Sequence, residues 1–289
     1  SAFATLERFH SIPEDSLFDP IEKGYKWGEE FGYCWFKTDF VVPDGLDGKD
    51  IFIRPHISCY EGTLWVDGVP YGNFCTKIVF TGHGNHYCDL LRKDAKAGDK
   101  IDLEYYAGHS YKGCHPTENL PLLTYDFSYE GIDICVKNYA VQEFYFDLRT
   151  LVQLVKNLPD SSFRRASVIN ELEQVFREIY QSPDDVDRDE FMAALERAKP
   201  YLKKALSVKN GDDAPKAVLI GHSHMDTAWL WHVGETVKKC ARTYANQLAL
   251  MDEYPEYKFI QSSSCHSDFL RRKYPDLFAR IQKRVSEGR

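Results

Sequence analysis

The stretch KAVLIGHSHMDTAWLW, residues 216–231, joins an apolar run to a dense group of polar and aromatic side chains. The run AVLI stops at Gly221, and His222, His224 and Asp226 follow at once. A short apolar run that ends at a glycine is typical of a buried strand in an α/β sheet. Loops at the carboxyl ends of such strands bind ligands, so the sequence predicts a functional site in this loop.

The residues after the loop predict a β-α-β-α unit. A helix is expected over residues 234–253, a second strand over YKFIQSSS (257–264), and then a further helix. Each helix is predicted from one apolar stripe with a spacing of three or four residues. The stripes are Val237, Ala241, Tyr244, Leu248 and Met251, then Leu277, Ile281 and Val285. We expect residues 216–289 to begin a barrel-like α/β catalytic domain that is truncated, because two strands do not make a stable parallel sheet.

Residues 1–139 are predicted to form an antiparallel β-sandwich of the jelly-roll type. Short runs such as YCWFKTDFVV (33–42), TKIVFTG (76–82) and KIDLEYYAG (100–108) alternate with glycine-containing turns. Large aromatic side chains in a sandwich mostly lie in its core, so we expect burial and not a sugar-stacking surface for the tryptophans of this region. These are Trp27, Trp35 and Trp65.

Between the two regions the periodicity becomes helical. Three helices are expected within residues 140–206, and the polar segment 207–215 is expected to be a linker. The three apolar stripes are Phe144, Leu148, Leu151 and Val155; Val168, Leu172, Val175 and Ile179; Phe191, Leu195, Ala198 and Leu202.

Composition narrows the function classes. The 289 residues carry a net charge of −8 with both signs interspersed, which excludes the basic stripe that nucleic acid requires. The eight cysteines are scattered and are expected to be free thiols in a reducing compartment. No signal peptide and no run of 18 apolar residues is present, so a cytoplasmic protein without a membrane partner is expected. Whether it forms a homo-oligomer stays open.

The spacing within the loop predicts a metal site. Residues two apart in extended chain face the same way, so His222, His224 and Asp226 should point together, opposite to Ser223 and Met225. Imidazole and carboxylate groups are suitable ligands for zinc. A strand-end hydrogen bond explains a single histidine equally well, and amidohydrolase-like enzymes also place His-x-His after their first strand. The spacing alone leaves these alternatives open.

A resemblance over a longer stretch of sequence distinguishes between these alternatives. GHSHMDTAWLW, RTYANQLALMDEYPEYKFIQSS and YPDLFARIQKRVSEGR resemble the start of the catalytic domain of glycoside hydrolase family 38 α-mannosidases. The preceding sandwich and helices resemble the N-terminal region of the cytosolic and bacterial branch of that family. The resemblance implies a retaining enzyme that hydrolyses terminal α-mannosidic bonds in oligosaccharides.

The resemblance also assigns roles. His224 and Asp226 are implied to hold one zinc ion, or another divalent metal such as cobalt, and Trp229 to form a wall for the mannose ring. The nucleophile, the acid/base and the remaining ligands are implied to lie beyond Arg289, so residues 1–289 alone should be inactive. A different class of function, a stand-alone carbohydrate-binding module, is the alternative.

Other polar residues receive weaker expectations. For His222 we favour an orienting role next to the metal ligands, or a strand-end hydrogen bond, over direct coordination. Gln261 and Ser262 can line the same pocket or cap the next helix. His83 and His86 in GHGNH are predicted to lie in a turn and not in a metal site, because no third ligand is near in sequence.

Overall fold

The structure is a computed structural model. By its internal contacts the chain divides into two compact units, residues 1–136 with 219–289, and residues 137–218. The first unit contains a β-sandwich and a helical layer, and the second consists of helices. The described residues are 1–28, 32–59, 61–74, 89–108, 127–179, 187–211, 214–229 and 233–289.

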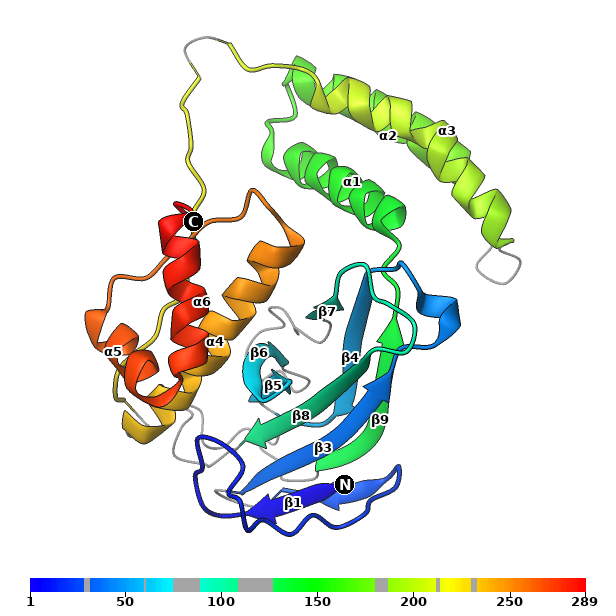
Figure 1. Ribbon diagram of the computed structural model, residues 1–289. Coiled ribbons are helices and arrows are strands. Elements are labelled where there is room, and N and C mark those ends of the chain that lie inside the picture. Colours follow the sequence, from blue (N-terminus) through cyan, green and yellow to red (C-terminus); the bar gives the residue numbers. More distant parts are fainter. Residues whose placement is uncertain are drawn as a thin grey trace, which may run out of the picture. The chain divides into compact units, whose positions relative to one another are not determined.

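Two antiparallel sheets form the sandwich, as the sequence predicts (Figure 1). The five-stranded sheet has the order β1-β3-β8-β5-β6, and the four-stranded sheet has the order β2-β9-β4-β7. The strands are β1 (Ala2–Thr5), β2 (Tyr25–Trp27), β3 (Tyr33–Val41), β4 (Ile51–Ile57), β5 (Glu61–Val66), β6 (Val69–Phe74), β7 (Asp89–Arg92), β8 (Lys100–Gly108) and β9 (Phe127–Cys135).

Turn chemistry sets the hairpin between β5 and β6. Asp67 and Gly68 have φ angles of 50° and 78°, the positive values that a two-residue type I′ turn requires. The segment TKIVFTG and the pair His83 and His86 lie outside the described residues.

The three sandwich tryptophans are buried, which confirms their expected place in the core. Trp27 packs with Phe127 between the two sheets, with ring centroids 4.9 Å apart. Trp35 and Trp65 instead belong to a second apolar cluster that includes α4 (Val233–Glu253). This placement leaves no sugar-stacking platform made of these three rings.

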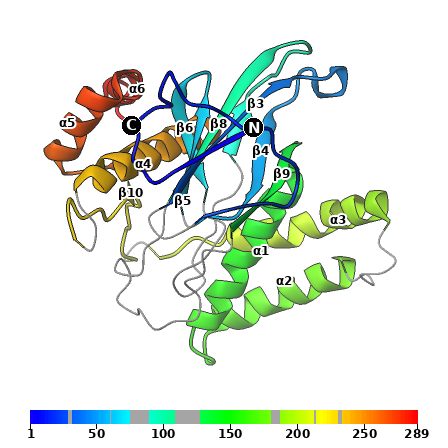
Figure 2. The ribbon, with the colours of Figure 1, turned by 90° about the horizontal axis from the view of Figure 1, so that it is seen from below.

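A layer of helices covers part of the five-stranded sheet (Figure 2). It consists of α4 with α5 (Ser264–Lys273) and α6 (Pro275–Ser286). Trp65 contacts Tyr274, which ends α5, at a centroid distance of 6.1 Å. The predicted stripe of α4 is confirmed, since all five of its members are buried. Sandwich and helices therefore share one apolar cluster.

Ionisable side chains are also buried between the sheet and α4. Glu235 accepts from Arg242 at 2.9 Å and lies 3.6 Å from Arg8 of the N-terminal segment. Lys238 is 3% exposed, and its Nζ lies 4.3 Å from the centre of the Tyr33 ring. Pairing of Glu235 with arginines is what permits these charges at a buried interface.

The parallel strand pair is shorter than expected. Strand β10 covers only Gly221–His222 and pairs with β11, Phe259–Ile260. The prediction of a buried strand over AVLI is wrong in position, because Val218 and Leu219 are 84% and 93% exposed. A segment becomes a strand only where a neighbour receives its hydrogen bonds, and β11 offers a partner to two residues alone.

Helix α5 was not expected, and Pro275 begins a separate helix directly after it. In the predicted stripe of α6, Leu277 is buried and Ile281 packs against the shared cluster. Val285 is 68% exposed and does not belong to the buried face.

The second unit consists of α1 (Tyr139–Asn157), α2 (Phe163–Ile179) and α3 (Arg188–Leu206). All members of the three predicted stripes lie in one apolar cluster, which confirms the predicted helices. Side chains cap the N-termini of α1 and α3. Asn138 accepts from the amide of Val141, and Asp187 accepts from those of Asp189 and Glu190. No helix in the described part of the chain is both long and apolar enough to span a membrane.

Candidate metal and sugar site

The loop follows β10, in which the backbone of Gly221 lies close to the side chain of Tyr257. A Cβ atom on Gly221 would lie 2.2 Å from the hydroxyl of Tyr257, closer than any side chain tolerates. The amide of Gly221 donates to the carbonyl of Lys258 at 2.9 Å. A larger residue at this position would require the Tyr257 side chain to move, so glycine suits the close approach of β10 to Tyr257.

His224 and Asp226 alternate with Met225 as predicted, but the predicted grouping of His222 with these two side chains is not found among the described residues. Met225 packs against the shared apolar cluster, and its sulfur lies 3.8 Å from Cys240 Sγ. The side chains of His224 and Asp226 are 86% and 43% exposed, and His224 Nε2 lies 3.2 Å from Asp226 Oδ2. The loop thus presents an imidazole and a carboxylate together on its accessible side.

His222 makes the strand-end hydrogen bond that was one of its two expected roles. Its Nδ1 lies 3.1 Å from the carbonyl oxygen of Ile260. A carbonyl oxygen only accepts, so Nδ1 is the ring nitrogen that carries the hydrogen in this contact. The described residues contain no cluster of three or more His, Cys, Asp or Glu side chains suited to a metal. His222 is therefore not grouped with His224 and Asp226 in this structure.

Gln261 supports the loop from β11. Its side-chain nitrogen donates to the carbonyl of Ser223 at 3.3 Å, and its side-chain oxygen accepts from the amide of Ser262 at 2.9 Å. The residue at the start of α5 is Ser263, whose side chain makes no capping hydrogen bond. Of the two roles expected for Gln261 and Ser262, the structure shows contact with the loop and not capping by Ser262.

Two hydrogen-bonding contacts of the loop were not predictable from the sequence. Thr236 of α4 donates its hydroxyl to the carbonyl of Thr227 at 2.6 Å. Thr227 Oγ1 lies 3.0 Å from Nε2 of His266, on α5. Burial lowers the pKa of His266, so its neutral form is favoured. Nothing in the periodicity marks these residues, because α5 itself was not expected.

Trp229 lies at the end of the described part of the loop and is 58% exposed. Trp231 lies outside the described residues. An accessible indole three residues after Asp226 can offer an aromatic face to a ligand, whereas the buried sandwich tryptophans cannot.

The pair His224 and Asp226 fits half of a zinc site. Zinc binds imidazole nitrogen and carboxylate oxygen at about 2.0–2.2 Å with tetrahedral geometry, so two such ligand atoms lie about 3.3–3.5 Å apart. The observed separation of 3.2 Å is close to this value. A zinc site takes about four ligands, so a metal held here needs donors in addition to these two.

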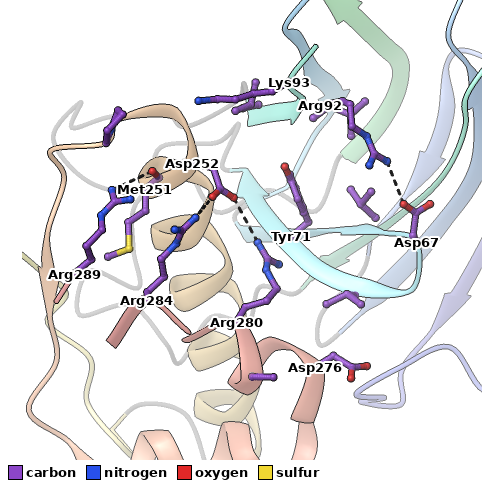
Figure 3. A pocket seen from close by; sticks show the side chains of 16 residues that line it. Asp67, Tyr71, Arg92, Lys93, Met251, Asp252, Asp276, Arg280, Arg284 and Arg289 are labelled. Atoms are coloured by element: carbon purple, nitrogen blue, oxygen red, sulfur yellow. Dashed lines mark hydrogen bonds and ion pairs between the residues drawn. The ribbon is translucent and has the colours of Figure 1, made fainter. Parts of the chain in front are cut away.

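A cavity of about 790 Å³ lies elsewhere in the first unit, and none of the predicted site residues lines it (Figure 3). Four of its charged residues are paired within the cavity: Arg284 bonds Asp252, and Arg92 pairs with Asp67 at 3.3 Å. The guanidinium of Arg280 lies 5.3 Å from the centre of the Tyr71 ring. The candidate site is therefore the accessible loop and not this cavity.

Two sequence profiles of protein families match parts of this chain, and one of the matches includes the loop. Residues 214–289 match the sequence profile of the glycosyl hydrolases family 38 N-terminal domain. Residues 7–116 match the profile of the α-mannosidase jelly roll domain. Together the two matches confirm the resemblance to the family 38 α-mannosidases, and the second confirms the jelly-roll type of the sandwich.

Individual relatives of the chain are named as α-mannosidases. The chain is 30% identical to "Alpha-mannosidase G" of Dictyostelium discoideum over 290 residues, which cover 94% of the chain and 25% of the relative. It is 25% identical to "Alpha-mannosidase 2C1" of Homo sapiens over 300 residues, covering 100% of the chain and 27% of the relative. The chain thus spans about a quarter of the length of the curated relatives it matches.

Proposed function

We propose that the protein containing this chain is a zinc-dependent, retaining α-mannosidase that hydrolyses terminal α-mannosidic bonds in oligosaccharides. The observation that carries the proposal is the accessible pair His224 and Asp226, 3.2 Å apart, within the part of the chain that matches family 38. The names of the relatives support the same sugar.

A second part of the proposal concerns the fold of the residues that follow the linker. Residues 216–289 are proposed to begin a barrel-like α/β catalytic domain. Support comes from the parallel pairing of β10 with β11 and from α4, which connects them. Val218 and Leu219 also support this proposal, because they are exposed here. Apolar residues of a parallel sheet are normally covered on both faces, so a larger sheet would bury them.

His224 Nε2 and Asp226 Oδ2 would hold one zinc ion, or another divalent metal such as cobalt. When bound, the metal would bind the 2- and 3-hydroxyls of the sugar and favour a distorted ring, without generating a hydroxide nucleophile. His222 would then orient its neighbours from the end of β10, where its ring is fixed by the carbonyl of Ile260.

Trp229 supplies the apolar half of sugar recognition in this proposal. A mannose ring offers hydroxyl groups to polar ligands and a C–H face to an aromatic ring, and the exposed part of the Trp229 indole can make the second contact. The two metal ligands and the indole lie on a single loop, and they would therefore contact the polar and the apolar sides of one sugar.

No residue of this chain is assigned as nucleophile or acid/base. Retaining hydrolysis requires two carboxyl groups about 5–5.5 Å apart, one to attack the anomeric carbon and one to protonate the leaving oxygen. Asp226 is assigned to the metal in this proposal, and no pair of carboxyl groups with this separation is assigned within residues 1–289. The chain of residues 1–289 by itself is accordingly proposed to be inactive.

The test is hydrolysis by the full-length protein of a panel of aryl glycosides. The proposal expects turnover of the aryl α-mannoside and none of the β-mannoside, with α-mannose as the first product seen by NMR. An inverted product would contradict the retaining mechanism, and absence of α-mannoside hydrolysis would contradict the assigned reaction.

A further inference from the structure

His266 is a buried polar residue that the proposed chemistry does not use. It lies in the first turn of α5 and is 2% exposed. Its ring lies 6.3 Å from that of Phe269, and its Nδ1 is buried without a hydrogen-bond partner among the described residues. A buried polar atom without a partner is costly, so this histidine is a poor choice for packing alone.

The polar contact that His266 does make reaches the candidate site. Its Nε2 lies 3.0 Å from the hydroxyl of Thr227, the residue directly after Asp226. The carbonyl of the same threonine accepts from Thr236, which is fully buried on α4. Thr227 is thus held from two helices, by its side chain on one and by its backbone on the other.

These two contacts fix the chain between the parts of the site. Asp226 precedes Thr227, and Trp229 follows it after one residue. A hydrogen bond from Thr236 fixes the carbonyl of Thr227, while the contact with His266 restricts the χ1 rotation of its side chain. Displacement of Thr227 would therefore move the carboxylate and the indole together.

We propose that His266 is a positioning residue, which acts through Thr227 to set the place of the segment from Asp226 to Trp229. The proposal rests on the proposed function for its effect on sugar hydrolysis, but not for its effect on the loop. The effect on hydrolysis is expected in kcat more than in KM, because misplaced groups bind a substrate but stabilise its transition state poorly.

Three variants of the full-length protein separate this role from simple packing. His266→Phe keeps a ring of similar size and removes both nitrogens, and Thr227→Val removes the hydroxyl from the other side of the contact. His266→Gln keeps a side-chain nitrogen near the position of Nε2. Ser267→Ala is the matched control, because Ser267 is the next residue on the same helix and its hydroxyl acts on Tyr244 and not on the loop.

Hydrogen–deuterium exchange of the peptide covering residues 221–229 is the first readout, and it is independent of activity. We expect faster exchange in His266→Phe and in Thr227→Val, recovery in His266→Gln, and no change in Ser267→Ala. We also expect kcat for an aryl α-mannoside to fall about tenfold in the first two variants, as one hydrogen bond allows, and their double variant to be no slower than either.

Exchange in Thr227→Val or His266→Phe equal to that of Ser267→Ala would overturn the proposal. Because Thr227→Val removes the contact without altering α5, the test does not depend on the folding of His266→Phe. If the unaltered protein hydrolyses no α-mannoside, the proposed function fails, and the exchange data alone still decide the role of His266.

Discussion

His224 Nε2 lies 3.2 Å from Asp226 Oδ2, and both groups are accessible at the carboxyl end of a short parallel strand. A second pair of the same chemistry lies in the sandwich, where His56 Nε2 is 2.7 Å from Asp133 Oδ2. This second pair lies on β4 and β9, outside the loop and outside residues 214–289, so it serves as a control for the first.

His224→Ala in the full-length protein is expected to reduce bound zinc below one ion per chain, because one of about four ligands is lost. Metal content measured by mass spectrometry on dialysed protein checks this. His56→Ala should leave the zinc content unchanged. One zinc ion per chain in His224→Ala would refute the role given to His224.

Trp229→Ala should lower kcat/KM for an aryl α-mannoside, with zinc content unchanged. An aromatic wall contributes about 1–3 kcal/mol through buried apolar area, and the indole is not a ligand. Trp229→Phe, which keeps an aromatic face, should recover part of the loss. Loss of zinc in Trp229→Ala would show that the indole supports the loop and does not serve the sugar.

Gly221→Ala is expected to destabilise the first unit by about 1–3 kcal/mol, because the new Cβ would overlap the hydroxyl of Tyr257. Chemical denaturation measures the change. Gly45→Ala is the control, since no atom lies within 4 Å of the added carbon. Equal stability of the two variants would contradict the close approach of β10 to Tyr257.

Lys238 predicts a dependence of stability on pH. Burial lowers its pKa in the folded protein to about 6, whereas an unfolded lysine has a pKa of about 10.4. Between these values the unfolded chain binds one proton more, so stability rises with pH by up to about 1.4 kcal/mol per unit. This contribution is complete above the unfolded value and is lost as pH falls toward about 6.

Denaturation between pH 6 and pH 9 tests this dependence. Lys238→Met should give a flatter curve than the unaltered protein, while substitution of the exposed Lys283 on α6 by Met should not. Parallel curves for the unaltered protein and Lys238→Met would show that Lys238 stays charged between the sheet and α4.

Periodicity was sufficient to predict much of this fold. Stripes of three- and four-residue spacing located α1 to α4, because each helix buries one face that its own sequence defines. Alternation in the loop likewise predicted that Met225 and His224 point to opposite sides. These features depend on local geometry, which residue spacing expresses directly.

Features that depend on partners distant in sequence were not predictable in the same way. The tryptophans were expected in the core, but nothing indicated that Trp35 and Trp65 would pack with α4 and Tyr274. The strand expected over AVLI was misplaced because strand pairing is set by the neighbour and not by the segment. The contact of His266 with Thr227 joins residues 39 positions apart and leaves no local pattern.

The central claim is that the loop from His222 to Trp229 is part of a metal-dependent mannosidase site. Its most direct test is hydrolysis of an aryl α-mannoside by the full-length protein before and after exhaustive chelation, and again after zinc is restored. The account predicts turnover that is lost on chelation and recovered with zinc, and a chain of residues 1–289 that shows none under any of these conditions. Unchanged turnover after complete metal removal would contradict the assignment of His224 and Asp226.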